Sequence, residues 1–190
     1  MPKNDFRILL SNDDGIHAPG LKTLEKIARE LTNDIWVVAP ESEQSGAAHS
    51  ITLSRPLRIR KLSAKRYAVD GTPTDCAALA LMKILKDKKP TLMLSGVNHG
   101  SNLGEDVTYS GTVAAAMEST LLGIPSIALS QSSEHGGGTR FSTAEHFAPD
   151  LIRRLLTAGW PKNVLMNINF PNLTKDDIRG VALVRQGLRY

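Results

Sequence analysis

The sequence predicts an α/β protein: an open, doubly wound (Rossmann-like), mostly parallel sheet with helices on both faces and a small β-hairpin excursion. Two observations support this fold class. Short, continuous apolar segments alternate along the chain with segments whose apolar residues recur at helical spacing. The connections are short, and apolar strands of this kind are typical of parallel sheets covered on both faces. Such folds bind ligands beyond the carboxyl ends of their strands, so the residues that follow each strand are the first candidates for a site.

In the first half of the chain, the apolar runs and the helical periodicities alternate from the start. Pro19 suits the first turn of a helix and Pro40 stops a strand. We expect strands at residues 7–11 and 35–39, a polar loop at 41–50, a hairpin over 57–61 and 66–69 with mostly exposed faces, and helices at 20–31 and 72–85.

In the second half the same alternation continues. Ser110 is expected to cap a helix that Gly123 closes, and Pro149 is expected to interrupt the next one. We expect strands at 91–95, 125–130, 164–170 and 181–185, loops at 96–109 and 132–139, and helices at 110–122 and 141–158.

Composition suits one soluble globular domain over residues 1–190. Hydrophobic residues make up 41% of the chain and charged residues 22%, which allows a sizeable core. The net charge of +4 is mild, and the densest basic group lies between Arg55 and Arg66. That group is either a solvated hairpin face or a surface that favours anionic substrates. Aromatic residues make up only 5% of the chain, so nucleic-acid polymer binding is not expected.

The single cysteine, Cys76, cannot form an internal disulfide, and its Ala-rich surroundings indicate a buried structural thiol. The sequence shows no signal peptide and no apolar run of membrane-spanning length. We therefore expect a cytoplasmic protein that does not contact membranes.

Asp13 and Asp14 stand side by side directly after the first expected strand, where like charges repel. Ser45 and Asn98 follow two other strands, so the fold carries all four side chains to the same edge of the sheet. These all-oxygen ligands suit one divalent cation, Mg²⁺ or Mn²⁺ with Ca²⁺ as an alternative occupant, rather than zinc. The alternative is turn chemistry plus a helix cap. Asn12 would tie the loop together and Gly15 would permit its turn.

Ser110, Gly111 and Thr112 begin an Ala-rich helix, and helix N-termini bind anions through unpaired N–H groups. An ordinary serine cap is the alternative, but a neighbouring dication site favours phosphate binding. A second helix entry at residues 71–75 either caps its helix or lines the crevice from the side. His49 and His99 could assist proton transfer or could be surface residues without a role. No nucleophile elbow, paired-histidine zinc motif or Walker-type loop occurs in the sequence.

Five blocks, in order along the chain, resemble the survival protein E (SurE) family of metal-dependent 5′-nucleotidases. They read ILLSNDDG from Ile8, VAPE from Val38 with Ser45-Gly46, GTPTDC from Gly71, SGVNHGSNLG from Ser95 and YSGTVA from Tyr109. The resemblance implies activity on 5′- and 3′-nucleotides and, in some members, on short polyphosphate. It also implies metal ligation by Asp13, Asp14, Ser45 and Asn98, and phosphate contacts near Asn102 and at residues 110–112.

Members of that family extend past the position of Tyr190 into a segment used for assembly. The resemblance therefore implies a homodimer or homotetramer, and we expect residues 1–190 not to include the C-terminal oligomerisation segment of the family.

The expected reaction is hydrolysis of a phosphomonoester by water at a dication-activated phosphate, with Asp13 or Asp14 orienting the water or handling its proton. The residues do not decide between these two carboxylates. Two other readings are a nucleotide-binding regulatory module without turnover and a metal-dependent nucleotide-sugar transferase. The loops at residues 41–53 and 132–139 are expected to shape the choice of substrate.

Overall fold

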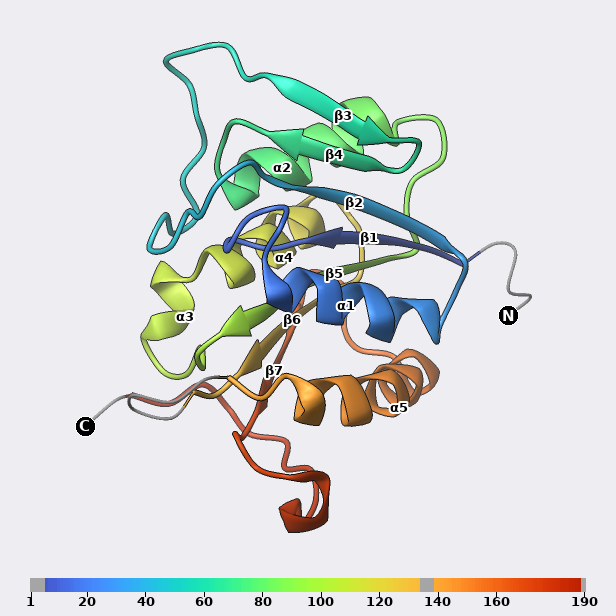
Figure 1. Cartoon of the computed structure of the whole chain (residues 1–190), viewed down its shortest axis with the longest axis vertical. Coiled ribbons are helices and arrows are strands. Elements are labelled where there is room, and N and C mark those ends of the chain that lie inside the picture. Colours follow the sequence, from blue (N-terminus) through green and yellow to red (C-terminus); the bar gives the residue numbers. More distant parts are fainter. Residues whose placement is uncertain (1–5, 134–138, 189–190) are drawn as a thin grey trace.

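The computed structural model describes residues 6–133 and 139–188. Within these residues, seven strands form one sheet in the order β3-β4-β2-β1-β5-β6-β7 (Figure 1). Every neighbouring pair is parallel except the antiparallel pair β3–β4. The strands are β1 (Arg7–Ser11), β2 (Asp34–Pro40), β3 (Ile59–Ser63), β4 (Arg66–Val69), β5 (Leu92–His99), β6 (Ser126–Gln131) and β7 (Met166–Phe170).

Helices cover both faces of the sheet, as expected for a doubly wound fold (Figure 1). One face carries α1 (Pro19–Arg29) and α5 (Ser142–Ala158). The other carries α2 (Pro73–Leu79), its π-helical continuation η1 (Ala80–Ile84) and α4 (Gly111–Leu121). Two short elements, α3 (Asp106–Tyr109) and the 3-10 turn η2 (Lys175–Asp177), lie in connections.

The central strands separate two hydrophobic cores. Along β1, Ile8 and Leu10 pack into the core under α1 and α5, whereas Leu9 between them packs into the core under α2 and α4. All three side chains are fully buried. Successive side chains of a strand point to opposite faces, so a continuous apolar run is what a strand covered on both sides requires. Cys76 is a fully buried member of the second core, as the sequence indicates.

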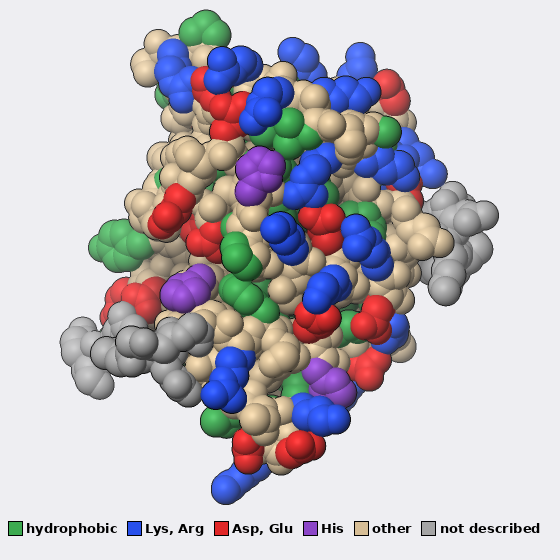
Figure 2. Space-filling view, viewed as in Figure 1, with side chains coloured by type: hydrophobic (Ala, Val, Ile, Leu, Met, Phe, Trp, Pro, Cys, Tyr) green, Lys and Arg blue, Asp and Glu red, His purple; other side chains and the backbone are tan. Residues whose placement is uncertain are grey.

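The hairpin forms the edge of the main sheet, because β4 pairs in parallel with β2. Ala68 and Val69 of β4 are fully buried, so the expectation of mostly exposed hairpin faces holds for β3 but not for the end of β4. Arg55, Arg58 and Arg60 pair with Asp70 and Glu41. On the face drawn in Figure 2, Lys and Arg side chains lie among Asp and Glu side chains.

Several expected boundaries are wrong. β5 continues to His99 and residues 106–109 form α3, where the sequence predicts one loop over 96–109. The helix expected over 72–85 changes from α2 to η1 at Ala80. Residues 181–185 form no strand, although the sequence predicts one. Leu183 is 91% exposed, so the apolar side chains of this segment do not pack against the sheet in the described structure.

Pro149 does not interrupt α5, contrary to expectation. The helix is continuous from Ser142 to Ala158. Ala148, Pro149 and Ile152 are buried, and this packing offsets the backbone hydrogen bond that proline cannot donate. The glycine run at residues 136–138, in the loop expected over 132–139, lies outside the described residues. None of the helices in the described ranges is long and apolar enough to cross a membrane.

Candidate metal and phosphate site

The candidate site forms where three strands of the sheet end. Asp13 and Asp14 follow β1, and hydrogen bonds connect them to the ends of the neighbouring strands. The Gln44 backbone N–H, in the loop after β2, donates to the Asp13 carbonyl oxygen at 2.8 Å. The backbone N–H of His99, at the end of β5, donates to the Asp14 carboxylate. The predicted convergence of these strand ends is therefore present in the structure.

The loop that carries the two carboxylates is built as its sequence indicates. Asn12 is fully buried, and its side-chain nitrogen donates to the Gly15 carbonyl oxygen at 3.0 Å. Gly15 has φ +100°, a conformation that favours glycine, and a Cβ there would lie 3.2 Å from the Ser42 carbonyl carbon. The glycine thus permits both the turn and the close approach of the loop after β2.

The start of α4 lies directly against Asp13. Thr112 is fully buried, and its hydroxyl donates to the Asp13 carboxylate. A Cβ on Gly111 would lie 2.7 Å from the Asp13 Cβ and 3.0 Å from Pro73 Cγ at the start of α2. Only glycine allows this approach of the helix. Ser110 caps α4, with its side-chain oxygen accepting from the Val113 N–H at 3.1 Å.

The electrostatics of the carboxylate pair are unfavourable in the protein alone. Burial raises the pKa of Asp13 from its ordinary value, and the hydrogen bond from Thr112 opposes that rise. Burial, followed by the charge of Asp13, raises the pKa of Asp14 from 3.8 to about 6. Glu43 adds negative charge next to both. Within residues 6–133 and 139–188, no Lys or Arg forms an ion pair with any of these three carboxylates.

The donor atoms of the other two predicted ligands fit a hard cation. The Asn98 side-chain nitrogen donates to the Gly100 carbonyl oxygen at 2.9 Å, while its carbonyl oxygen makes no hydrogen bond within the described part of the chain. A register shift between Ser95 and Asn98 re-aims the end of β5. The exposed Ser45 hydroxyl donates to Glu43 at 2.7 Å. No cluster of three or more His, Cys, Asp or Glu suited to a metal occurs among the described residues, so a site here relies on neutral oxygens as well.

Asn102 lies in a cluster of amides rather than at an open surface. It is 6% exposed, and its side-chain nitrogen donates to Ser130 at 2.8 Å. Its backbone carbonyl oxygen accepts from the side-chain nitrogens of Asn167 and Asn169 at 2.9 and 3.1 Å. The Asn169 side-chain oxygen accepts from the Asn102 N–H at 2.8 Å. These bonds fix the segment between β5 and α3 to β6 and β7.

Sequence reasoning did not single out Glu43, Asn167 or Asn169. The signal for the two asparagines was present, because amides at alternate positions of the apolar stretch VLMNINF require buried partners. The signal for Glu43 was its place two residues before Ser45. Of the histidines, His49 lies 2.9 Å from Glu118 of α4 through its Nε2, which ties the loop after β2 to that helix.

Comparison with known proteins agrees with the resemblance drawn from the five sequence blocks. The model of the family described as survival protein SurE matches residues 8–190. The chain is 63% identical to the 5′-nucleotidase SurE of Paramagnetospirillum magneticum, over 98% of this chain and 72% of that protein. It is 60% identical to the 5′-nucleotidase SurE of Parvibaculum lavamentivorans, over 97% and 67%.

The fold agrees as well. The crystal structure of the SurE protein from Aquifex aeolicus matches with a TM-score of 0.89 and 44% identity, over 96% of this chain and 73% of that one. The chain thus spans between 67% and 73% of the length of these three relatives. On the family match and these identities, the chain belongs to the survival protein SurE family.

Proposed function

We propose that this chain is a 5′-nucleotidase, a phosphoric monoester hydrolase that releases phosphate from nucleoside 5′-monophosphates by attack of water. The observation that carries the proposal is the pair of buried carboxylates held against the start of α4. The pair attracts cations and the helix start attracts anions, so the two together suit a metal-associated phosphate. Relatives more than half identical to this chain are named 5′-nucleotidases.

We propose that Asp13, Asp14, Ser45 and Asn98 hold one divalent cation per subunit, Mg²⁺ or Mn²⁺, with Ca²⁺ as an alternative occupant. The residues fit such an ion, since they combine unneutralised carboxylates with an unused amide oxygen. The ion would supply positive charge that polarises the phosphate. When the ion binds, the Ser45 hydroxyl would give up its hydrogen bond to Glu43 and its oxygen would contact the ion.

The phosphate contacts fall to the start of α4. The Ser110 hydroxyl caps the helix, and both the hydroxyl and the backbone N–H of Thr112 donate to Asp13, so the backbone N–H of Gly111 remains for a phosphate oxygen. Asn102 acts by fixing its segment beside the site, because its side-chain nitrogen is already engaged by Ser130. Thr112 holds Asp13, so Asp14 is the carboxylate that orients the water molecule and accepts its proton.

Phosphate release from a substrate panel tests the proposal. The panel contains nucleoside 5′- and 3′-monophosphates and short polyphosphate, after chelation and with each of Mg²⁺, Mn²⁺ and Ca²⁺ added back. We expect release from 5′-nucleotides that EDTA abolishes and Mg²⁺ or Mn²⁺ restores, and release from 3′-nucleotides and polyphosphate as further activities. Asp14→Asn should abolish it, whereas Asp150→Asn, the same change at an exposed position of α5, should not.

Two outcomes would contradict the proposal. Full activity in EDTA would exclude the dication, and nucleotide binding without any phosphate release would indicate a regulatory module instead. A cytoplasmic location and assembly into a homodimer or homotetramer are further proposals, and sedimentation of the purified chain tests the assembly.

A further inference from the structure

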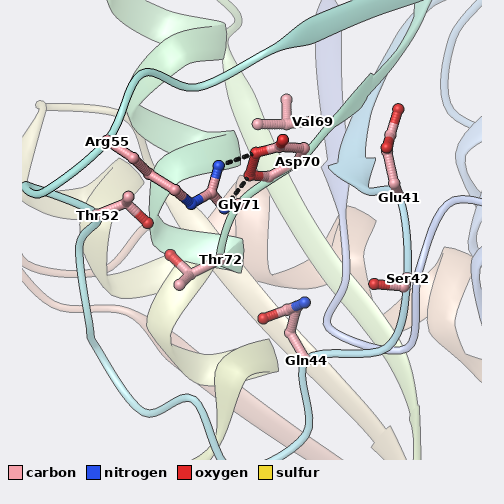
Figure 3. Close-up of a pocket in the computed structure, with 9 residues that line it drawn as sticks. All are labelled: Glu41, Ser42, Gln44, Thr52, Arg55, Val69, Asp70, Gly71 and Thr72. Carbon is pink, nitrogen blue, oxygen red and sulfur yellow. Dashed lines mark hydrogen bonds and ion pairs between the residues drawn. The ribbon is translucent and has the colours of Figure 1, made fainter.

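An open cavity of about 240 Å³ lies beside the candidate site, at the carboxyl ends of β2 and β4 (Figure 3). These strands are neighbours, and the Glu41 N–H donates to the Val69 carbonyl oxygen at 2.8 Å where both end. Its walls come from the loop after β2, the segment before β3 and the entry to α2, and include Ser42, Gln44, Arg55, Gly71 and Thr72.

The cavity and the candidate site share two walls. Gln44 lines the cavity, while its backbone N–H donates to the Asp13 carbonyl oxygen at 2.8 Å. Thr72 lines the cavity, and the next residue, Pro73, lies against Gly111 at the phosphate-binding helix start. A molecule whose phosphate lies at α4 can therefore extend past these walls into the cavity.

Arg55 presents a flat cation at the cavity. Its guanidinium donates to the Asp70 carboxylate and, at 2.7 Å, to the Asp70 carbonyl oxygen (Figure 3). Both bonds lie at the edge of the guanidinium, so its faces stay available, and the side chain is 50% exposed. The preceding segment is anchored as well, because Thr52 donates to Asp75 of α2 through both its N–H and its hydroxyl. A fixed guanidinium plane is a surface on which bases stack.

Hydrogen-bonding groups on the opposite wall are unused. The Gln44 amide and the Ser42 hydroxyl make no hydrogen bond through their side chains among the residues that the structure describes, and both line the cavity. A glutamine amide both donates and accepts, which matches the edge of a nucleobase. At about 240 Å³ the cavity is smaller than a site for a whole drug-sized ligand, which suits one part of a nucleotide.

We propose that this cavity is the nucleobase subsite, in which the base of a nucleoside monophosphate stacks on Arg55 while Gln44 hydrogen-bonds to its edge. The inference rests on the proposed 5′-nucleotidase function, and it names the residues that bind the leaving nucleoside. Arg55 contributes through its plane rather than through its charge, since Asp70 already neutralises it.

Steady-state kinetics with 5′-AMP, 5′-GMP, 5′-CMP, 5′-UMP and ribose 5-phosphate test the subsite. The readout is the ratio of KM for each nucleotide to KM for ribose 5-phosphate, which has no base. Arg55→Lys keeps the charge and removes the plane, so this ratio should rise about five-fold or more for all four nucleotides. Gln44→Ala should change the order of preference among the four bases. Arg58→Lys, the same change at an arginine that pairs with Glu41, should leave the ratios unchanged.

The outcomes separate the subsite from the function. Equal ratios in wild type, Arg55→Lys and Arg58→Lys, or a wild type that binds ribose 5-phosphate as well as the nucleotides, would overturn the subsite while the hydrolase stands. A wild type that hydrolyses none of these esters would overturn the function, and calorimetric Kd ratios for the same compounds would then decide the subsite. If Arg55→Lys fails to fold by circular dichroism, an unchanged base preference in Gln44→Ala overturns the proposal.

Discussion

Asp14→Asn should make the metal-free protein more stable at neutral pH, although it should abolish activity. Burial and the charge of Asp13 raise the pKa of Asp14 from 3.8 to about 6 in the folded protein. The folded state therefore holds the proton more tightly than the unfolded state does. The contribution of Asp14 to stability is therefore fully present below pH about 4. It is lost as the pH rises through about 6, because the carboxylate must then ionise in an unfavourable place.

The magnitude follows from the size of the shift. A rise from 3.8 to about 6 corresponds to at most about 3 kcal/mol of unfolding free energy at pH 8. Asp14 is only partly buried, so solvent screening reduces the expected effect to about 1–2 kcal/mol. Asparagine has nearly the same shape, can still accept the hydrogen bond from the His99 N–H, and does not ionise.

Thermal unfolding in EDTA between pH 4 and pH 8 measures the effect. At pH 8 the variant should melt about 2–8 °C above wild type, and the difference should vanish near pH 4, where Asp14 is protonated in wild type as well. Adding Mn²⁺ should raise the Tm of wild type but not that of the variant. A variant less stable than wild type at pH 8 in EDTA, or a difference independent of pH, would refute this account of the carboxylate pair.

Three further predictions concern neighbouring residues. Thr112→Val removes the hydroxyl that donates to Asp13 and should lower the free energy of unfolding in urea by about 1.5–3 kcal/mol. Thr112→Ser keeps the hydroxyl and should lower it by about 1 kcal/mol. Equal losses in the two variants would exclude the hydrogen bond as the cause. Gly111→Ala places a Cβ 2.7 Å from the Asp13 Cβ, so kcat/KM should fall about ten- to hundred-fold, and unchanged kinetics would contradict the close approach. The pKa of Asp34 is lowered to about 2, because hydrogen bonds from Lys65 and Arg7 outweigh its burial. Its stabilisation is present above pH about 4 and is lost as the pH falls through about 2, so Asp34→Asn should cost about 1 kcal/mol at pH 7 and nothing near pH 2, as urea titrations at both values can show.

Much of the fold could be predicted because local patterns and packing agree in the central strands. The residues of β1 are apolar on both sides because both sides are covered, and that pattern has no other simple explanation. The entry to α2 shows the same agreement. Thr72 and Asp75 form a capping box with Pro73 in the first turn, which confirms that this segment caps its helix. Gly71 and Thr72 also line the cavity at the ends of β2 and β4.

Predictions failed where long-range packing decides the outcome. Pro149 should end a helix by its local chemistry, but its burial on the sheet stabilises a continuous α5. Residues 181–185 have the pattern of a strand, yet a strand needs a partner, and the sequence pattern does not show whether one exists. The segment 96–109 reads as a loop from its glycines and asparagines, although pairing with β6 extends β5 to His99.

The candidate site shows the same division. The sequence predicted that Asp13, Asp14, Ser45 and Asn98 lie at one edge of the sheet, because the position of residues at the ends of parallel strands depends only on the topology. It could not assign individual hydrogen bonds. Thr112 was expected to face phosphate, and its hydroxyl instead donates to Asp13, while the Asn102 side-chain nitrogen is occupied by Ser130. These partners lie up to 99 positions away in the sequence, beyond the reach of local patterns.

Calorimetric titration of Mn²⁺ into the metal-free protein tests most directly whether Asp13 and Asp14 form a metal site. We expect one ion bound per chain in wild type and in Asp150→Asn, and no binding in Asp14→Asn with its fold intact. Equal Mn²⁺ binding by wild type and Asp14→Asn would contradict the assignment of the paired carboxylates as the metal site.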